Sequence, residues 1–388
     1  LFSAYDLIKV LETRKSKRFK LIGRRRELEE YSNLLKKKKA VLINIKAEAG
    51  LGKSVLVNKL FEDRRKETEC CLVNCLSYTK NNTYYAVREF IAKFAGVTIF
   101  DGTKEKIRKL EALLKFAGEA GNTELFAEFM SWKEKPSATN DPGLKDFFME
   151  VTMSIFSRVM KEKRTVLYLE DAHWLDPASA DLFLSLLNVF EPEEFPCFIH
   201  FVYRPDNMLA PFENCGSSHT LELNNLEYDE GKQFLLEKFN LTTIPAKIYE
   251  QIYQKTKGNP FFMEEILLGL KNEGNLIPDR ESGGEVKIED KFMSERDKAL
   301  AALEKSSVQY RIKPSIKTIS IPDNVNDIVL SRIDRLDENS KTILKIASVI
   351  GRIFQFDILK QLKNLTEIAD RLDIKDSLFD LTKVDLTI

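Results

Sequence analysis

The sequence predicts an α/β protein in which a parallel sheet is flanked by helices. Short, continuously apolar runs of the kind that form strands buried on both faces recur along the first part of the chain. Segments with helical apolar periodicity lie between these runs. The predicted strands are residues 40–45, 70–77, 165–170, 196–206 and 219–223, and the predicted helices include residues 83–95, 103–117 and 143–161.

The most specific stretch is AVLINIKAEAGLGKSVLVNKL, residues 40–60. An apolar strand runs into a loop of small residues, and a helix begins near Lys53. This layout favours a phosphate-binding loop, because glycines let backbone N–H groups turn toward phosphate oxygens and the helix N-terminus adds its dipole. Lys53 would contact the β- and γ-phosphates, and the Ser54 hydroxyl would bind Mg²⁺.

Ala47 stands where the strict pattern G-x-x-x-x-G-K-[ST] has its first glycine. An alanine fits this position if its φ is negative or only mildly strained. The alternative interpretation is a helix N-terminus that contains the letters GKS by chance, which is expected about 0.2 times in a chain of this length. The preceding apolar strand and Gly50 favour the phosphate-binding loop.

A second informative stretch, TVLYLEDAHWLDPAS, covers residues 165–179. Its apolar strand ends in Glu170 and Asp171, which places two carboxylates at the sheet edge where α/β proteins bind ligands. Beside a phosphate-binding loop, Glu170 would hold Mg²⁺ and Asp171 would polarise the attacking water. Standing alone, the pair would be interpreted as a solvated acidic turn.

Neighbouring residues of this stretch have local interpretations. We expect Asp176 to cap the following helix, with Pro177 in its first turn. His173 either senses the nucleotide or is a packed or water-bonded imidazole, the second being the simpler interpretation. Trp174 is expected to belong to the core.

Arg204 ends the predicted strand of residues 196–206. A lone arginine at a strand end is usually solvated. If its strand lies beside the strand of the phosphate-binding loop, however, Arg204 points at the same sheet edge, and its guanidinium would reach the γ-phosphate.

Composition sets outer limits on function. The chain has 388 residues with 43% hydrophobic content, which suits two or three domains. Basic and acidic residues number 60 each, which argues against a dedicated nucleic-acid binder although the first forty residues are locally basic. No apolar run has the length of a membrane span. The five cysteines lack paired C-x-x-C spacing, so we expect reduced residues in a cytoplasmic protein. Separately, because the sequence starts at Leu1 and stops within a helical pattern, we expect it to be part of a longer protein.

Several motifs, in this order, resemble the ATPase module of the STAND class (signal-transduction ATPases with numerous domains), relatives of the AAA+ proteins. They are LIGRRREL, AEAGLGKS, LYLEDAHWLDPAS, VYRPD and KGNPFF. The resemblance implies a P-loop NTPase core, a helical lid and a winged-helix-like domain. We expect a lead-in at residues 1–20, the core at 21–224, the lid at 225–275, a charged insertion with one helix near 290–305 at 276–320, and the winged-helix-like domain at 321–388.

The resemblance also implies roles for individual residues. Glu170 matches the metal-binding residue, which is more often Asp, and Asp171 matches the second acidic position. Arg204 matches a sensor arginine, Pro260 matches the proline of a Gly-x-Pro lid motif, and Arg24 would approach the adenine or ribose. Pro260 has a simpler interpretation as the start of a buried helix. Together, the expected nucleotide-binding residues are Arg24, Ala49, Gly50, Gly52, Lys53, Ser54, Val55 and Pro260; the metal ligands are Ser54 and Glu170; the catalytic residues are Asp171 and Arg204.

Three functions fit this sequence. The first is a switch that binds ATP or ADP with Mg²⁺, hydrolyses ATP slowly and controls an effector domain of the parent chain or a partner protein, with nucleotide-dependent self-association. The second is a DNA-binding ATPase similar to AAA+ replication initiators, which the neutral charge disfavours. The third is a degenerate pseudo-ATPase that serves as a scaffold. The departures at Ala47 and Glu170 bear on the rate of hydrolysis, whereas nucleotide binding is still expected.

Overall fold

The computed structural model describes residues 21–98, 100–132, 142–279, 309–316 and 336–350, together with residues 330, 333–334, 374, 377–378 and 381. The helix predicted near residues 290–305 and most of the region predicted to be winged-helix-like lie outside the described residues. The chain divides into two compact units, the first running to Glu237 and including Gly258–Phe261, the second comprising Lys238–Lys257 and the chain from Phe262.

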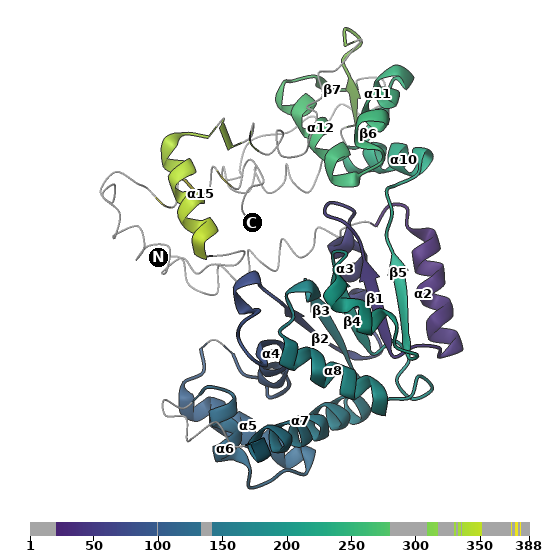
Figure 1. Cartoon of the computed structure of the whole chain (residues 1–388). Helices are drawn as coiled ribbons and strands as arrows, with labels where there is room; N and C mark the ends of the chain where they lie inside the picture. The colour runs from purple at the N-terminus through teal and green to yellow at the C-terminus, as the bar shows by residue number, and fades with distance from the viewer. Residues whose placement is uncertain are drawn as a thin grey trace, which may run out of the picture. The chain divides into compact units, whose positions relative to one another are not determined.

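The first unit contains a five-stranded sheet in the order β2-β3-β4-β1-β5 (Figure 1). All four strand pairs are parallel. The predicted parallel sheet is therefore confirmed, and each predicted apolar run overlaps one strand. The strands are β1 (Leu42–Lys46), β2 (Glu69–Asn74), β3 (Thr165–Glu170), β4 (Ile199–Tyr203) and β5 (Ser218–Glu222).

Helices flank this sheet, as predicted, and α3 begins at the residue expected from the sequence. The short helix α6 was not predicted, because seven residues carry too little periodicity to be recognised. The helices of the first unit are α2 (Arg25–Lys37), α3 (Lys53–Arg64), α4 (Tyr85–Phe94), α5 (Thr103–Ala117), α6 (Thr123–Phe129), α7 (Pro142–Glu162), α8 (Pro177–Val189), α9 (Ala210–Glu213) and most of α10 (Tyr228–Lys238), with 3-10 turns η1 (Ser77–Thr79), η2 (Ala172–Trp174) and η3 (Asn207–Leu209).

Asp176 caps helix α8, as predicted. Its carboxylate accepts hydrogen bonds from the backbone N–H of Ser179 at 3.0 Å and from the Ser179 hydroxyl at 2.6 Å. The same side chain also accepts from the backbone N–H of Tyr84 at 2.7 Å, just before helix α4. One buried carboxylate thus satisfies donors at the starts of two helices that pack against each other.

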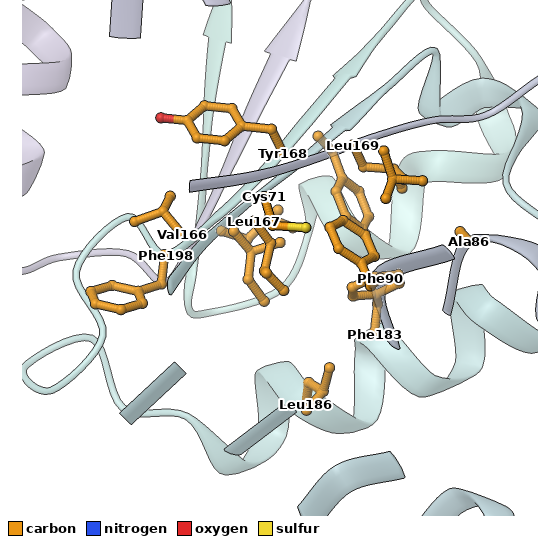
Figure 2. Close-up of a cluster of buried hydrophobic side chains, with 14 of the residues drawn as sticks. Cys71, Ala86, Phe90, Val166, Leu167, Tyr168, Leu169, Phe183, Leu186 and Phe198 are labelled. Carbon is orange, nitrogen blue, oxygen red and sulfur yellow. The ribbon is translucent and has the colours of Figure 1, made fainter. Parts of the chain in front are cut away.

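The two faces of the sheet bury different kinds of side chain. Figure 2 shows Tyr168 on one side of β3 and Leu167 on the other, where Leu167 lies near Phe183 and Leu186 of helix α8. On that second face, Phe183 also makes an edge contact with Phe201 of β4, with ring centroids 5.3 Å apart. Because successive strand residues alternate in direction, this face is an apolar core, and the opposite face contains polar rings.

A buried aromatic cluster occupies the face opposite α8. His200 of β4 is fully buried and stacks on Tyr168 with ring centroids 4.3 Å apart. Its Nε2 lies 3.0 Å from the hydroxyl of Tyr31 on helix α2. Burial lowers the pKa of His200 to about 3, and the nearby Arg64 guanidinium contributes in the same direction. The imidazole is therefore neutral in the folded protein at ordinary pH.

The second unit contains helix α11 (Ala246–Thr256), α12 from Phe262 onward (Pro260–Asn272 in all), and α15 (Glu338–Ile350). It also has a three-stranded sheet in the order β6-β8-β7, formed by Leu241–Thr243, Tyr310–Ile312 and Leu276–Pro278. Two of these short strands fall inside the stretch predicted to be an insertion at 276–320, where the sequence indicated no strand.

No helix in the described part of the chain combines the length and the apolarity that crossing a membrane requires.

The buried imidazole makes the stability of the first unit depend on pH. The unfolded chain binds a proton at His200 below pH 6.5 and the folded protein does so only near pH 3, so stability falls as pH decreases between these values. From pH 7 to pH 5 the loss from this residue amounts to about 2 kcal/mol. Urea unfolding followed by fluorescence of Trp132 and Trp174, both in the first unit, measures it.

The comparison variant is His200→Gln, which has no titrating ring. It is expected to be less stable than wild type at pH 7 but to lose about 2 kcal/mol less on going to pH 5. An equal loss in both proteins would show that His200 is not the group responsible.

Candidate functional site

The carboxyl ends of three adjacent strands meet at one edge of the sheet in the first unit. Lys46, the last residue of β1, pairs in register with Tyr203 of β4, and Val202 of β4 pairs with Glu170 of β3. The loop after β1 is joined to this edge by a hydrogen bond from Ala47 N to Tyr203 O at 3.2 Å. The structure therefore brings the start of the predicted phosphate-binding loop, the acidic pair and Arg204 to neighbouring strand ends.

The loop between β1 and α3 has its backbone carbonyls bonded by donors from several elements. The Lys53 ammonium donates to Ala47 O at 2.6 Å and to Glu48 O at 2.7 Å. The Asn259 side-chain amide donates to Ala49 O at 3.3 Å, and the backbone N–H of Phe261 donates to Gly50 O at 3.3 Å. The remaining bonds join Arg24 Nη2 to Leu51 O at 2.8 Å, and Val55 N and Leu56 N to Gly52 O, both at 3.1 Å.

The backbone N–H groups of residues 48–54 behave differently. In the described parts of the chain none of them donates a hydrogen bond to a protein acceptor. Because the loop carbonyls are bonded by surrounding groups, these amides form a run of donors that ends at the N-terminus of α3. Such an arrangement of successive N–H groups at a helix start attracts an anion.

Gly50 and Ala47 satisfy the conformational demands of this loop. Gly50 has φ +81°, and a Cβ placed there would lie 2.9 Å from Asn259 Oδ1 and 3.0 Å from Phe261 Cβ, so both the backbone and the space require glycine. Ala47 is buried and its φ is not positive. The departure from the strict glycine pattern at Ala47 therefore introduces no backbone strain.

Lys53 lies among groups of both signs. Its pKa is lowered, chiefly because the ammonium is partly buried and secondly because of the Arg204 guanidinium, while Asp171 and Glu48 act in the opposite direction. A phosphate group near Lys53 would favour the charged ammonium and compensate for its lost hydration. Ser54, the predicted metal ligand, is exposed in the first turn of α3, next to the half-buried Val55.

Glu170 and Asp171 occupy different environments although they are adjacent. Glu170 is buried at the end of β3, and its backbone carbonyl accepts a hydrogen bond from Cys75 N at 2.9 Å. Asp171 is half-buried and has a left-handed backbone conformation with φ 53°. This left-handed residue lies directly after the last residue of β3 and before the 3-10 turn η2. Among the residues that the structure describes, no three His, Cys, Asp or Glu side chains gather into a preformed metal site.

His173 lies in the same charged environment, in the turn η2. Burial lowers its pKa, with Arg204 and Lys53 adding to the effect and Asp171 and Asp206 opposing it. Its Nδ1 atom is buried and has no hydrogen-bond partner in the described structure. The half-buried ring packs beside Trp174, whose centroid is 5.0 Å away, and Trp174 packs against the core as predicted.

Arg24 makes contacts that the sequence did not reveal. The side chain is 5% exposed, and besides Leu51 O it contacts Glu27, with 3.0 Å between Nη1 and Oε1. The residue has a left-handed backbone with φ 60° at the start of α2. Its guanidinium therefore joins helix α2 to the phosphate-binding loop, whereas the predicted approach to adenine or ribose stays a prediction.

One cavity of the first unit is separate from this site. It has a volume of about 560 Å³ and lies between α2 and the start of β5, with Arg26, Lys37 and His219 among its lining residues. The start of β5 is at the amino end of the strands. The cavity therefore contains no residue of the loop or of the acidic pair.

Comparison with known proteins supports the assignment of class. Residues 20–199 match the AAA ATPase domain family. No curated protein matches the chain. The family match and the loop between β1 and α3 agree with the prediction of a P-loop ATPase domain, and the match places an AAA-type ATPase domain at residues 20–199.

Three solved structures are similar to this chain at low identity. One is a signal-transduction ATPase with numerous domains with a tetratricopeptide repeat sensor from Pyrococcus horikoshii, with 14% identity and a TM-score of 0.48 over 94% of this chain and 39% of that one. Another is Cdc6p from Pyrobaculum aerophilum, with 12% identity and a TM-score of 0.36 over 94% and 86%. The third is a Walker-type ATPase of Pyrococcus abyssi, with 12% identity and a TM-score of 0.37 over 95% and 92%. This chain therefore spans well under half of the length of the P. horikoshii protein.

Replacing Arg24 is expected to destabilise the first unit. Arg24→Ala removes two charge-assisted hydrogen bonds and leaves Leu51 O without this donor, which should cost about 2 to 3 kcal/mol of unfolding free energy. The exposed neighbour Arg25 is a matched control, because removing its side chain should change stability by less than about 0.5 kcal/mol. Tryptophan fluorescence during urea unfolding measures both. Similar values for the two variants would contradict the role assigned to Arg24.

Proposed function

We propose that this module binds ATP and ADP with Mg²⁺, hydrolyses ATP slowly and acts as a regulatory switch for an effector domain. The effector would belong to the parent chain or to a partner protein. The observation that carries the proposal is the loop of residues 47–52, whose carbonyls are all bonded while the amides of residues 48–54 have no protein acceptor among the described residues.

Binding follows from the chemistry of that loop. The amides of residues 48–54, the N-terminus of α3 and the Lys53 ammonium supply directional donors and positive charge, which match the oxygens of a di- or triphosphate. On binding, the Lys53 ammonium would exchange its two carbonyl contacts for the stronger attraction of phosphate oxygens. In this proposal Ala49, Gly50, Gly52, Lys53, Ser54 and Val55 surround the phosphates.

The residues present fit Mg²⁺. Mg²⁺ prefers oxygen ligands and is usually held by one or two protein groups together with substrate phosphates, so a preformed cluster of three side chains is not required. Ser54 and Glu170 would supply the hydroxyl and the carboxylate. When bound, the metal would neutralise charge on the β- and γ-phosphates.

Hydrolysis would depend on Asp171 and Arg204. Asp171 follows the buried end of β3, and its negative charge acts on Lys53 by raising the pKa of the ammonium. Its carboxylate would therefore be suited to orient and deprotonate a water beside the γ-phosphate. Arg204 is exposed at the end of β4 and would stabilise charge on the transferred phosphoryl group. Slow turnover is expected for a switch, because the bound state must persist long enough to be detected.

The regulatory part of the proposal rests on chain connectivity. Gly258–Phe261 belongs to the first unit, whereas Lys257 before it and Phe262 after it belong to the second. Pro260, the first residue of α12, would lie near the base or ribose, as would Arg24. A switch of this kind would have two conformational states. A ligand shifts the equilibrium between two states only if it binds them with different affinities, so ATP and ADP must differ in their relative affinities for the two states. Nucleotide-dependent self-association would be one outcome of the switch. The five cysteines are free thiols, which suits a protein of the reducing cytoplasm.

The two alternative functions, a pseudo-ATPase scaffold and a DNA-binding initiator, predict different experimental results. A pseudo-ATPase scaffold would bind nucleotide weakly or not at all, or would bind it without hydrolysis. A DNA-binding initiator would shift DNA in a salt-dependent way, because phosphate contacts release counterions. The balanced charge of the chain favours the switch over the initiator.

The first test is nucleotide binding to Lys53→Ala. Loss of a charge-assisted contact with phosphate should weaken ATP binding by roughly 10- to 100-fold. Lys59→Ala is the matched control, because Lys59 is an exposed lysine of the same helix that pairs with Asp63. Calorimetry with ATP and Mg²⁺ gives the three affinities. Equal affinity of wild type and Lys53→Ala would exclude this loop as the binding site.

The second test separates the two carboxylates. Asp171→Asn should bind ATP about as well as wild type but lose hydrolysis, because only the orientation and activation of water are affected. Glu170→Gln should instead lose most of the effect of Mg²⁺ on ATP affinity. Calorimetry with and without Mg²⁺, together with phosphate release, distinguishes them. The reverse pattern would mean that the roles of Glu170 and Asp171 are exchanged.

A further inference from the structure

The segment Gly258–Phe261, here called the clasp, holds the phosphate-binding loop from outside. Two successive loop carbonyls are bonded by it: Ala49 O accepts from the Asn259 side chain, and Gly50 O accepts from Phe261 N, both at 3.3 Å. All of these residues belong to the first unit. The clasp therefore contributes two of the bonds that direct the loop carbonyls away from the run of free amides.

The clasp is also fixed at its base. Leu226 N donates to Gly258 O at 2.9 Å, shortly after strand β5. Gly258 is buried with φ +81°, and a Cβ at this position would collide with the backbone carbonyl of Leu226. Only glycine permits this approach, because any side chain would push the clasp away from the segment after β5. Since β5 pairs with β1, the loop and the base of the clasp are fixed to the same sheet.

Asn259 also occupies the N-cap position of helix α12, and an experiment must separate that position from the hydrogen bond to Ala49 O. It directly precedes Pro260, the first residue of α12, and asparagine followed by proline is a favoured start of a helix. Capping a helix uses the side-chain oxygen as an acceptor. The bond to Ala49 O uses the side-chain nitrogen as a donor, so the two properties can be removed independently.

We infer that Asn259 is a positioning residue for the phosphate-binding loop, and that occupancy of the loop acts on α11 and α12 of the second unit through the clasp. This inference rests on the proposed nucleotide binding. The clasp is continuous with α11 on one side and with the rest of α12 on the other, so a change in the loop carbonyls reaches both helices through a few covalent bonds. The same bonds act in reverse, because coupling between two binding events is reciprocal.

The decisive variants are Asn259→Ser and Asn259→Asp. Both side chains cap helices well, but neither provides an amide donor that reaches Ala49 O. Asn33→Ser and Asn33→Asp, at an exposed position of α2, are the matched controls. The Asn259→Asp substitution would also add a negative charge close to the phosphates, so nucleotide affinity is compared only with the serine variants.

The first readout is hydrogen exchange in the nucleotide-free protein. The Phe261 N–H reports the clasp directly, because it donates to Gly50 O. Both Asn259 variants should accelerate its exchange by about threefold to tenfold, whereas amides further along α12 should not change, because the cap is retained. Wild-type exchange at Phe261 in both variants would overturn the inference and leave Asn259 as a helix cap only.

The second readout is binding and transmission. ADP affinity of Asn259→Ser should fall by about threefold to tenfold, with wild-type affinity in Asn33→Ser. ADP should alter exchange in α11 and α12 of wild type, and this response should shrink in Asn259→Ser at saturating ADP. A full response in that variant would overturn the transmission. If wild type bound no nucleotide, the proposed function would fail, and the nucleotide-free exchange at Phe261 would still decide whether Asn259 positions the loop.

Discussion

The structure of the site depends on one constraint, which is that the backbone carbonyls between β1 and α3 are bonded from outside the loop. A peptide group carries its donor and acceptor on opposite sides, so fixing the carbonyls of residues 47–52 also fixes where the amides point. The donors come from Lys53 within the motif, Arg24 before the first strand, and Asn259 and Phe261 far along the chain. Arg24, Asn259 and Phe261 therefore preorganise the loop from parts of the first unit outside the motif itself.

This arrangement explains which parts of the site the sequence reveals. The loop, Glu170, Asp171 and Arg204 are recognisable because each follows an apolar strand, and the carboxyl ends of parallel strands share one edge of the sheet. Asn259 is 210 residues from Ala49, and nothing in the local pattern of KGNPFF indicates which backbone oxygen its amide contacts. The involvement of Arg24 in the loop was hidden for the same reason, although its motif drew attention to the residue.

The fold shows the same division between local and long-range information. Long periodic segments such as α5 and α7 were predicted nearly to their ends because many residues contribute to the pattern. The strands Leu276–Pro278 and Tyr310–Ile312 have three residues each, and they form because each pairs with a segment distant in sequence. Three residues cannot display an alternating pattern, so the sequence of this segment, which is rich in charge and glycine, indicated no strand.

The charges at the start of α3 and at the neighbouring strand ends are balanced only in part. Lys53 and Arg204 repel each other, because the charge of Arg204 contributes to lowering the pKa of Lys53. Asp171 acts in the opposite direction on the pKa of both Lys53 and His173 and so compensates for part of this positive charge. A triphosphate would satisfy both cations but would also bring negative charge toward Asp171 and the buried Glu170. Holding a divalent cation between Glu170 and the phosphates would relieve that repulsion at the point where it is greatest. Glu170 is buried and Asp171 is half-buried, so Glu170 has less water to screen its charge. A bound metal would therefore stabilise the charge of Glu170 more than that of Asp171.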